Sequence, residues 1–225
     1  VPASDVTLAV FSASFKGAGK NTSVLIGAEL SHLALGELDA SGRLPDEVEL
    51  TAVVTGLRKT IDSRTNHVRL SLTPERAQQT GGAVRVLYRF DLAPGQYQVR
   101  VAARDGNSGR IGSVVRDVDV PDLVNQKTPL AMSGIVVTSA RATELVTTGD
   151  VDRLTSLLGL APAARRQFAP DDELVVFAEV YDRVMAPHQD VVSARVINQV
   201  GQTVLEHIDA VTNALLRNDR GTYEH

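Results

Sequence analysis

The residues best placed to do chemistry in this chain form the loop Asp105-Gly106-Asn107-Ser108-Gly109. Asp and Asn at alternate positions are similar to the first ligands of a calcium-binding loop. A complete loop of that kind needs further acidic ligands and a bidentate Glu at its twelfth position, where this sequence has Arg116. We therefore interpret Asp105–Gly109 as a plain hairpin loop, with calcium binding as the alternative.

Histidines are the other candidate metal ligands, and the sequence has five: His32, His67, His188, His207 and His225. No two of them stand four residues apart, and no His-Glu-x-x-His motif occurs. The absence of cysteine excludes disulfides, thiol chemistry and Cys-based zinc sites. We therefore expect solvated surface histidines, no metal and no cofactor. A zinc site assembled across strands is an alternative that no motif supports.

Motifs of nucleophilic and phosphate chemistry are absent as well. The sequence has no Gly-x-Ser-x-Gly elbow, no Gly-x-Gly-x-x-Gly after a strand and no Gly-x-x-x-x-Gly-Lys loop. A glycosidase would need two carboxylates that can lie far apart in the chain, and nothing in the sequence favours such a pair. We expect no catalytic residue and no enzyme activity.

Charged and aromatic residues point to no binding surface either. The net charge of −4 and the absence of a basic stretch exclude a nucleic-acid footprint. Four arginines point outward by strand parity and are expected to be solvated, on opposite sheets: Arg85, Arg89, Arg100 and Arg104. Aromatic residues are only 4% of the chain, without Trp, so we expect Phe11, Phe15, Phe177 and Tyr181 to serve packing rather than sugar binding.

The elements that carry these residues are mostly strands. Apolar residues alternate with polar ones, which is typical of a strand with one buried face. Before Pro121 the alternation predicts seven strands, at 6–15, 24–30, 48–54, 68–72, 84–92, 97–104 and 113–120. Seven short strands separated by Gly- and Pro-containing turns predict an all-β, immunoglobulin-like sandwich.

One turn in this region has a specific expected role. Pro94 fixes φ, and Gly95 supplies the positive φ that the third residue of a type II turn requires. Tyr97 follows two residues later, at the start of the sixth strand, where a hydroxyl can bond back to the preceding turn. We interpret Pro94, Gly95 and Tyr97 as a tyrosine corner, a structural site.

The chain divides into two modules. We expect residues 1–121 to form the first sandwich, 122–129 to be a linker, and 130–225 to form a second sandwich-like module. "VLIGAEL" (24–30) is similar to "LVVFAEV" (174–180), and "DEVELTAVVTGLRKTIDS" (46–63) to "DVVSARVINQVGQTVLEH" (190–207), so the second module is a weak repeat. It carries an insertion in which Asp150 is expected to cap a short helix.

The repeat lacks counterparts of the last two strands of the first module. "RGTYEH" (220–225) aligns best with "VRVLYRF" (84–90), and no second Pro-Gly-x-Tyr strand follows it. Three arrangements would satisfy the open sheet: a continuing chain that supplies the strands, pairing with a second copy, or packing of the second module against the first.

Two segments carry a family resemblance. "YRFDLAPGQYQVRVAARDGNSGRIGS" (88–113) and "RRQFAPDDELVVFAEVYD" (165–182) resemble the region that follows the von Willebrand factor A domain in acidobacterial VWA-related proteins. The resemblance implies an exported, modular protein and supplies neither catalytic nor metal-binding residues. The Asp-x-Ser-x-Ser metal motif of the A domain is absent from this sequence.

Together these observations favour a non-catalytic structural or protein-interaction segment of an exported multidomain protein. We expect an unidentified protein partner, with an edge-to-edge homodimer as one form of it, and neither nucleic-acid binding nor membrane insertion. A carbohydrate-binding accessory module is the alternative function.

Overall fold

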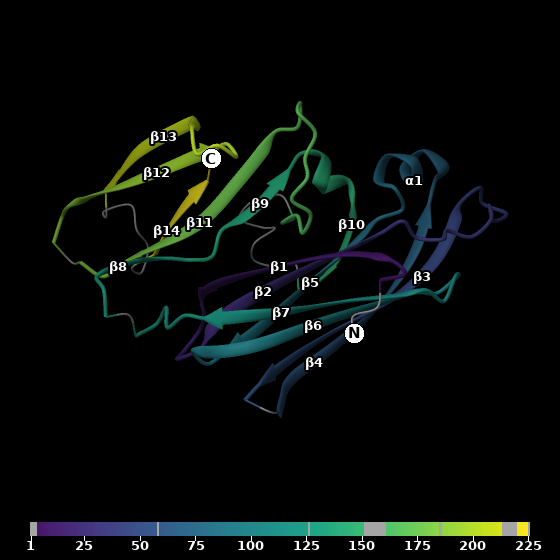
Figure 1. Cartoon of the computed structure of the whole chain (residues 1–225), viewed down its shortest axis with the longest axis horizontal. Helices are drawn as coiled ribbons and strands as arrows, with labels where there is room; N and C mark the ends of the chain where they lie inside the picture. The colour runs from purple at the N-terminus through teal and green to yellow at the C-terminus, as the bar shows by residue number, and fades with distance from the viewer. Residues whose placement is uncertain are drawn as a thin grey trace.

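The computed structural model describes residues 4–57, 59–125, 127–150, 161–184, 186–212 and 220–224. Within these residues the chain is all-β apart from one short α-helix and one 3₁₀ turn, which confirms the predicted fold class. Figure 1 shows the strands stacked in layers, with the first sandwich below and the second module above it.

The first sandwich contains the seven expected strands. One sheet has the order β1-β2-β5, from β1 (Thr7–Lys16), β2 (Thr22–Ser31) and β5 (Val84–Leu92). The facing sheet has the order β4-β3-β6-β7, from β4 (Lys59–Leu72), β3 (Leu44–Gly56), β6 (Gly95–Asp105) and β7 (Ile111–Val120). Strands β5 and β6 therefore lie in opposite sheets, as in immunoglobulin topology.

The core of this sandwich follows the alternation of the sequence. In β3 every second residue is completely buried: Val48, Leu50, Ala52 and Val54. Each Val or Leu side chain among these contributes about 1.5–3 kcal/mol when removed from water. One polar bond crosses the core, because the Tyr88 hydroxyl of β5 donates to the Leu50 carbonyl at 2.9 Å. Burial raises the pKa of Tyr88 well above its ordinary value, so this hydroxyl keeps its proton.

A short helix that the strand pattern did not predict joins the two sheets. Helix α1 (Pro74–Thr80) begins at Thr73, whose hydroxyl accepts the Arg76 N–H at 3.3 Å, and Pro74 occupies its first turn. It ends at Gly81, whose φ of 62° is left-handed. None of its residues is buried, so the helix carries no apolar period that could reveal it.

The second module is built around β11 (Leu174–Asp182). This strand pairs antiparallel with β14 (Arg220–Glu224) along one edge, and with β8 (Leu130–Met132) and β9 (Val136–Ser139) along the other. The turn η1 (Arg141–Glu144) follows β9, and β12 (Gln189–Ile197) and β13 (Thr203–Thr212) form a separate two-stranded hairpin. The helix expected after Asp150 falls on 151–160, outside the described residues.

The strand pairings of the first module recur in the second. Strand β2 pairs antiparallel with β5, and its repeat partner β11 pairs antiparallel with β14. Strands β3 and β4 form a hairpin, as do their repeat partners β12 and β13. Among the described residues, however, no strand takes the place beside β12 that β6 takes beside β3.

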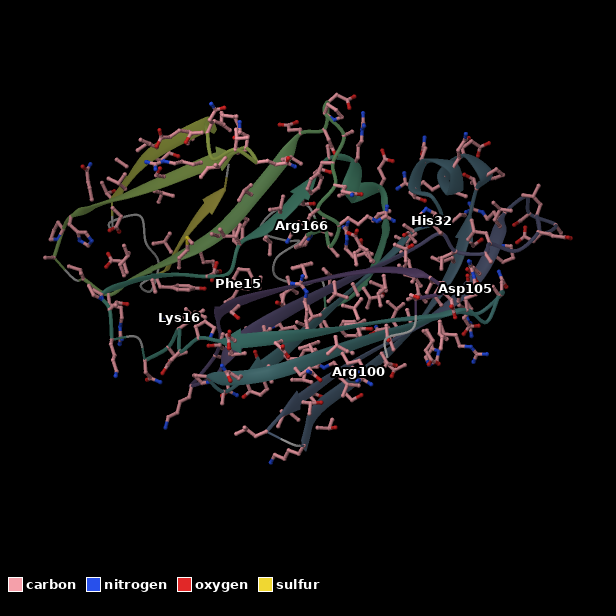
Figure 2. All side chains as sticks on the ribbon, viewed as in Figure 1. Phe15, Lys16, His32, Arg100, Asp105 and Arg166 are labelled. Atoms are coloured by element: carbon pink, nitrogen blue, oxygen red, sulfur yellow. The ribbon has the colours of Figure 1, made fainter. Side chains whose placement is uncertain are left out.

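The second module also packs against the first. It donates β10 (Val146–Gly149), which pairs parallel with β5 and extends that sheet to four strands. Aromatic rings of both modules meet in a second apolar cluster, where Phe15 and Phe177 lie 6.3 Å apart. Figure 2 shows Phe15 and Arg166 on this side of the first sandwich, with Arg100 on the far side. All ten residues of β2 are consequently buried.

Candidate functional site

The Tyr97 turn has the expected bond but a different backbone. The Tyr97 hydroxyl donates to the Ala93 carbonyl at 2.8 Å, closing the turn that contains Pro94. Gly95 has a φ of 154°, which is far from the roughly +80° of a type II turn. The expected turn type is wrong because Gly95 already belongs to β6 and pairs with Val120.

The Asp105–Gly109 loop is held by its own carboxylate. Asp105 Oδ2 accepts the Ala34 N–H at 2.8 Å, and Oδ1 accepts the Ser108 N–H at 3.0 Å. Arg110 Nη2 lies 3.6 Å from Oδ2. Burial acts to raise the pKa of Asp105, but these donors outweigh it and hold the pKa below its usual value. The carboxylate thus joins the hairpin to the segment before β3.

The expectation of four solvated arginines is wrong for Arg85. Its side chain is completely buried, whereas Arg100 and Arg104 are exposed and Arg89 is partly exposed. Strand parity places Arg85 correctly on the outer face of the β1-β2-β5 sheet. That face is not solvent, however, because the second module covers it.

Arg85 forms the centre of a buried polar network between the modules. Its Nε and Nη2 both lie 2.7 Å from Glu29 Oε1 on the neighbouring strand. Its remaining donors reach the second module, at 3.1 Å to the Ala161 carbonyl and 3.0 Å to the Ala142 carbonyl. Glu29 also accepts the Ala164 N–H at 2.9 Å. Burial lowers the pKa of Arg85, although the Glu29 carboxylate opposes this effect.

A cavity of about 520 Å³ opens beside this network. Its lining includes Glu29, Arg85, Arg141, Arg165 and Phe168. The size falls within the range of small-molecule sites, and the lining offers cationic donors beside one aromatic side chain. Sequence reasoning missed this cavity because its residues come from distant segments that only module packing brings together.

The β12–β13 hairpin exposes apolar side chains on both of its faces. Its strands pair only with each other among the described residues. Seven large apolar side chains on it are exposed, from 52% to 78%: Val191, Val196, Ile197, Val200, Val204, Leu205 and Ile208. An isolated two-stranded hairpin is marginally stable in water, so a hairpin that exposes these side chains has the properties of a sheet that further elements cover.

Three possible metal ligands converge where β11 ends and β12 begins. One oxygen or nitrogen atom from each of Asp182, His188 and Asp190 lies within 4.8 Å of the others. Asp182 is buried, whereas His188 and Asp190 are partly exposed. The sequence predicted no metal ligand, because each residue alone is unremarkable and only the bend between the two strands brings them together.

Comparisons with known proteins give a partial likeness of fold. No protein-family model and no curated protein matches the chain, so the VWA-related resemblance stays a prediction. A calcium-binding mutant of β-glucuronidase 2 from Bacteroides uniformis matches 56% of this chain at 11% identity, with a TM-score of 0.36. A second B. uniformis β-glucuronidase structure matches 50% at 12% identity, with a TM-score of 0.35. The chain spans 13% of the length of each enzyme.

In the part of the chain that the structure describes, no helix is long and apolar enough to cross a membrane.

Proposed function

We propose that this chain is a non-catalytic interaction segment in which β12 receives an extended strand from a partner protein. The observation that carries the proposal is that no described residue pairs with one edge of β12, at the place where its repeat partner β3 pairs with β6. Addition of an antiparallel strand would use main-chain hydrogen bonds for affinity and side-chain pockets for specificity.

The burial of equivalent residues supports this location. In β3, Val48, Leu50 and Ala52 are completely buried between β6 and the facing sheet. In the repeat alignment these positions correspond to Val192, Ala194 and Val196 of β12. Val192 and Ala194 are only half-buried and Val196 is 52% exposed. A partner strand beside β12 would cover part of these side chains, in the place that β6 takes beside β3.

The composition of the edge also favours pairing. Exposed edge strands are commonly protected by charges, Lys or Pro. Strand β4, which is an edge strand of the first sandwich, carries three basic residues, of which Lys59 and Arg69 are exposed and Arg64 is partly exposed. The hairpin from Gln189 to Thr212 contains neither Lys nor Pro, and β12 carries one basic residue, Arg195. Its edge is therefore less protected against an incoming strand than that of β4.

A photo-crosslinking experiment tests the proposal. A benzophenone amino acid replaces Val191, which is 69% exposed on β12, or Leu57, which is 98% exposed on the β3–β4 turn. The chain is then irradiated in cells of its source. We expect a discrete crosslinked product from position 191 that Val196→Lys abolishes and Ile111→Lys leaves unchanged.

Ile111 is a matched control because it is 47% exposed and lies on β7, an edge strand outside the hairpin. A product containing two copies of this chain would identify a second copy as the partner. Equal products from positions 191 and 57, or none from position 191, would contradict the proposal. Hydrolysis of esters, glycosides or peptides above buffer controls would contradict its non-catalytic part.

The proposed context is an exported multidomain protein, supported by the resemblance of residues 88–113 and 165–182 to VWA-related sequences. The interaction through β12 does not depend on that context.

A second candidate function is binding of a small polar ligand such as a sugar in the 520 Å³ cavity. The guanidinium groups of Arg141 and Arg165 beside Phe168 favour it, because hydroxyl groups bind such donors while a sugar ring packs on an aromatic face. A glycan array tests this function with Phe168→Ala as the variant. Binding of one sugar class that Phe168→Ala abolishes would support it, and a featureless array would exclude the sugars on the array.

A further inference from the structure

The three residues that converge beside the hairpin come from two strand ends. Asp182 is the last residue of β11, Asp190 is the second residue of β12, and His188 lies just before β12. Their side chains belong to segments that must turn sharply between the central sheet and the hairpin. Contacts among these three side chains therefore link the two sheets of the second module.

Two of the three distances between these side chains match the spacing of ligands around one ion, and the third pair lies within 4.8 Å. Asp182 Oδ2 lies 3.1 Å from His188 Nε2, and His188 Nε2 lies 3.6 Å from Asp190 Oδ1. Ligands that bind one tetrahedral ion at about 2.0 Å are roughly 3.3 Å apart. A first-row divalent ion could reach all three atoms with little movement of the side chains.

Hydrogen bonds outside the trio orient two of the ligands. His188 Nδ1 lies 2.8 Å from the Ala186 carbonyl, which can only accept, so Nδ1 carries the proton and Nε2 faces the carboxylates. This is the usual arrangement of a metal-bound histidine, whose second nitrogen donates to a carbonyl or carboxylate. Asp182 Oδ1 accepts the Val184 N–H at 2.8 Å, which turns Oδ2 toward His188.

Separate evidence that Asp182, His188 and Asp190 accommodate a ligand comes from the oxygen Oδ2 of Asp182. The Asp182 side chain is 1% exposed, and Oδ2 is buried without a hydrogen-bond donor. A buried carboxylate oxygen in that state is costly unless a cation compensates it. The oxygen is directed at the space that His188 Nε2 and Asp190 Oδ1 also face.

The charge of the group also calls for a cation. With a neutral imidazole the three side chains carry two negative charges, and the Nε2 lone pair faces two carboxylates. A divalent ion would compensate both charges.

We propose that Asp182, His188 and Asp190 bind one divalent first-row metal ion, with zinc as the best match. One nitrogen and two carboxylate oxygens are ligands that zinc accepts, and three protein ligands leave a position for water. Partial exposure of His188 and Asp190 leaves that position open to solvent. The ion would fix the hairpin to the end of β11, and its binding does not depend on the proposed partner.

Zinc titration of the full chain without an affinity tag, followed by calorimetry at pH 7.5, tests the site. We expect one equivalent to bind, and His188→Gln and Asp190→Asn each to weaken binding at least tenfold. His207→Gln is the matched control, because His207 Nε2 lies 2.9 Å from Asp209 Oδ2 on the same hairpin. This control should bind zinc like the parent chain.

A second readout separates binding from folding. Cobalt substituted for zinc should give visible absorption bands of a four- or five-coordinate ion, absent from His188→Gln. Circular dichroism should show that His188→Gln and Asp190→Asn keep the parent fold, since neither residue is fully buried. Absence of binding at about 1 mM zinc, binding that survives both substitutions, or equal loss in His207→Gln would overturn the proposal.

Discussion

Replacement of Arg85 by Met would remove the cation at the centre of the network between the modules. Glu29 would keep the Ala164 and Arg165 N–H donors and the Arg165 guanidinium 3.8 Å away. The Ala161 carbonyl would keep the Thr138 hydroxyl at 2.6 Å, whereas the Ala142 carbonyl would lose the Arg85 donor. Removal of one partner from a buried ion pair costs about 3–5 kcal/mol. Because Arg165 remains near Glu29, we expect about 3 kcal/mol.

Urea denaturation followed by circular dichroism measures this free energy of unfolding. The double variant Glu29→Gln/Arg85→Met should lose less than the sum of the two single variants, because it leaves no unpaired charge buried. Arg100→Met is the matched control, since Arg100 is exposed on the far side of the sandwich, and it should change stability by less than about 0.5 kcal/mol. A loss below about 1 kcal/mol for Arg85→Met, with an unchanged m-value, would refute the role given to the pair.

Four further outcomes are expected. Tyr97→Phe should lower the free energy of unfolding in urea by about 1 kcal/mol, the net value of one hydrogen bond. An unchanged denaturation midpoint would contradict a stabilising bond from the Tyr97 hydroxyl to the Ala93 carbonyl. Gly27→Ala should lower the free energy of unfolding by about 1–3 kcal/mol, because the Cβ of the new alanine would lie 1.9 Å from the Phe11 ring. The second substitution Phe11→Leu should recover part of this stability. No recovery would contradict the proposed clash. A fragment of residues 1–124 should melt cooperatively, because its main core lies within residues 6–120, but at a lower temperature than the full chain; a non-cooperative melt would show that the modules share one core. The parent chain should lose stability as pH falls below about 4, because the folded pKa of Asp105 lies below its unfolded value, and Asp105→Asn should flatten this loss; an unchanged slope below about pH 4 would exclude Asp105 as a contributor.

Alternation of apolar residues was sufficient to predict the first sandwich. The period of two specifies which side chains of a strand share a face, and the strand 84–92 was predicted with the bounds that β5 has. The same period cannot tell whether the outer face meets water or another layer. Arg85 was therefore placed on the correct face and in the wrong environment. Leu25 and Gly27 on the outer face of β2 were the available signal that a further layer covers this sheet.

The candidate sites were harder to predict because they arise from convergence between segments. His188 and Asp182 are six residues apart, and their meeting depends on the bend after β11 rather than on a periodic motif. The 520 Å³ cavity draws residues from both modules. The edge of β12 was different, because the internal repeat alone predicted that no neighbour equivalent to β6 would be found beside it among the described residues.

The late position of β10 in the chain has a consequence for biosynthesis. When β5 leaves the ribosome, its free edge and the apolar outer face with Phe15 have no cover. The segment that seals the edge follows about 60 residues later, which at usual rates of synthesis is roughly 3–12 s. During this interval we expect Glu29 and Arg85 to be surface charges, which oppose pairing and aggregation of the nascent sheet. An apolar pair at these positions would expose more apolar surface on the growing chain, and in the finished protein it would leave the Ala142 carbonyl and the Ala164 N–H without these partners.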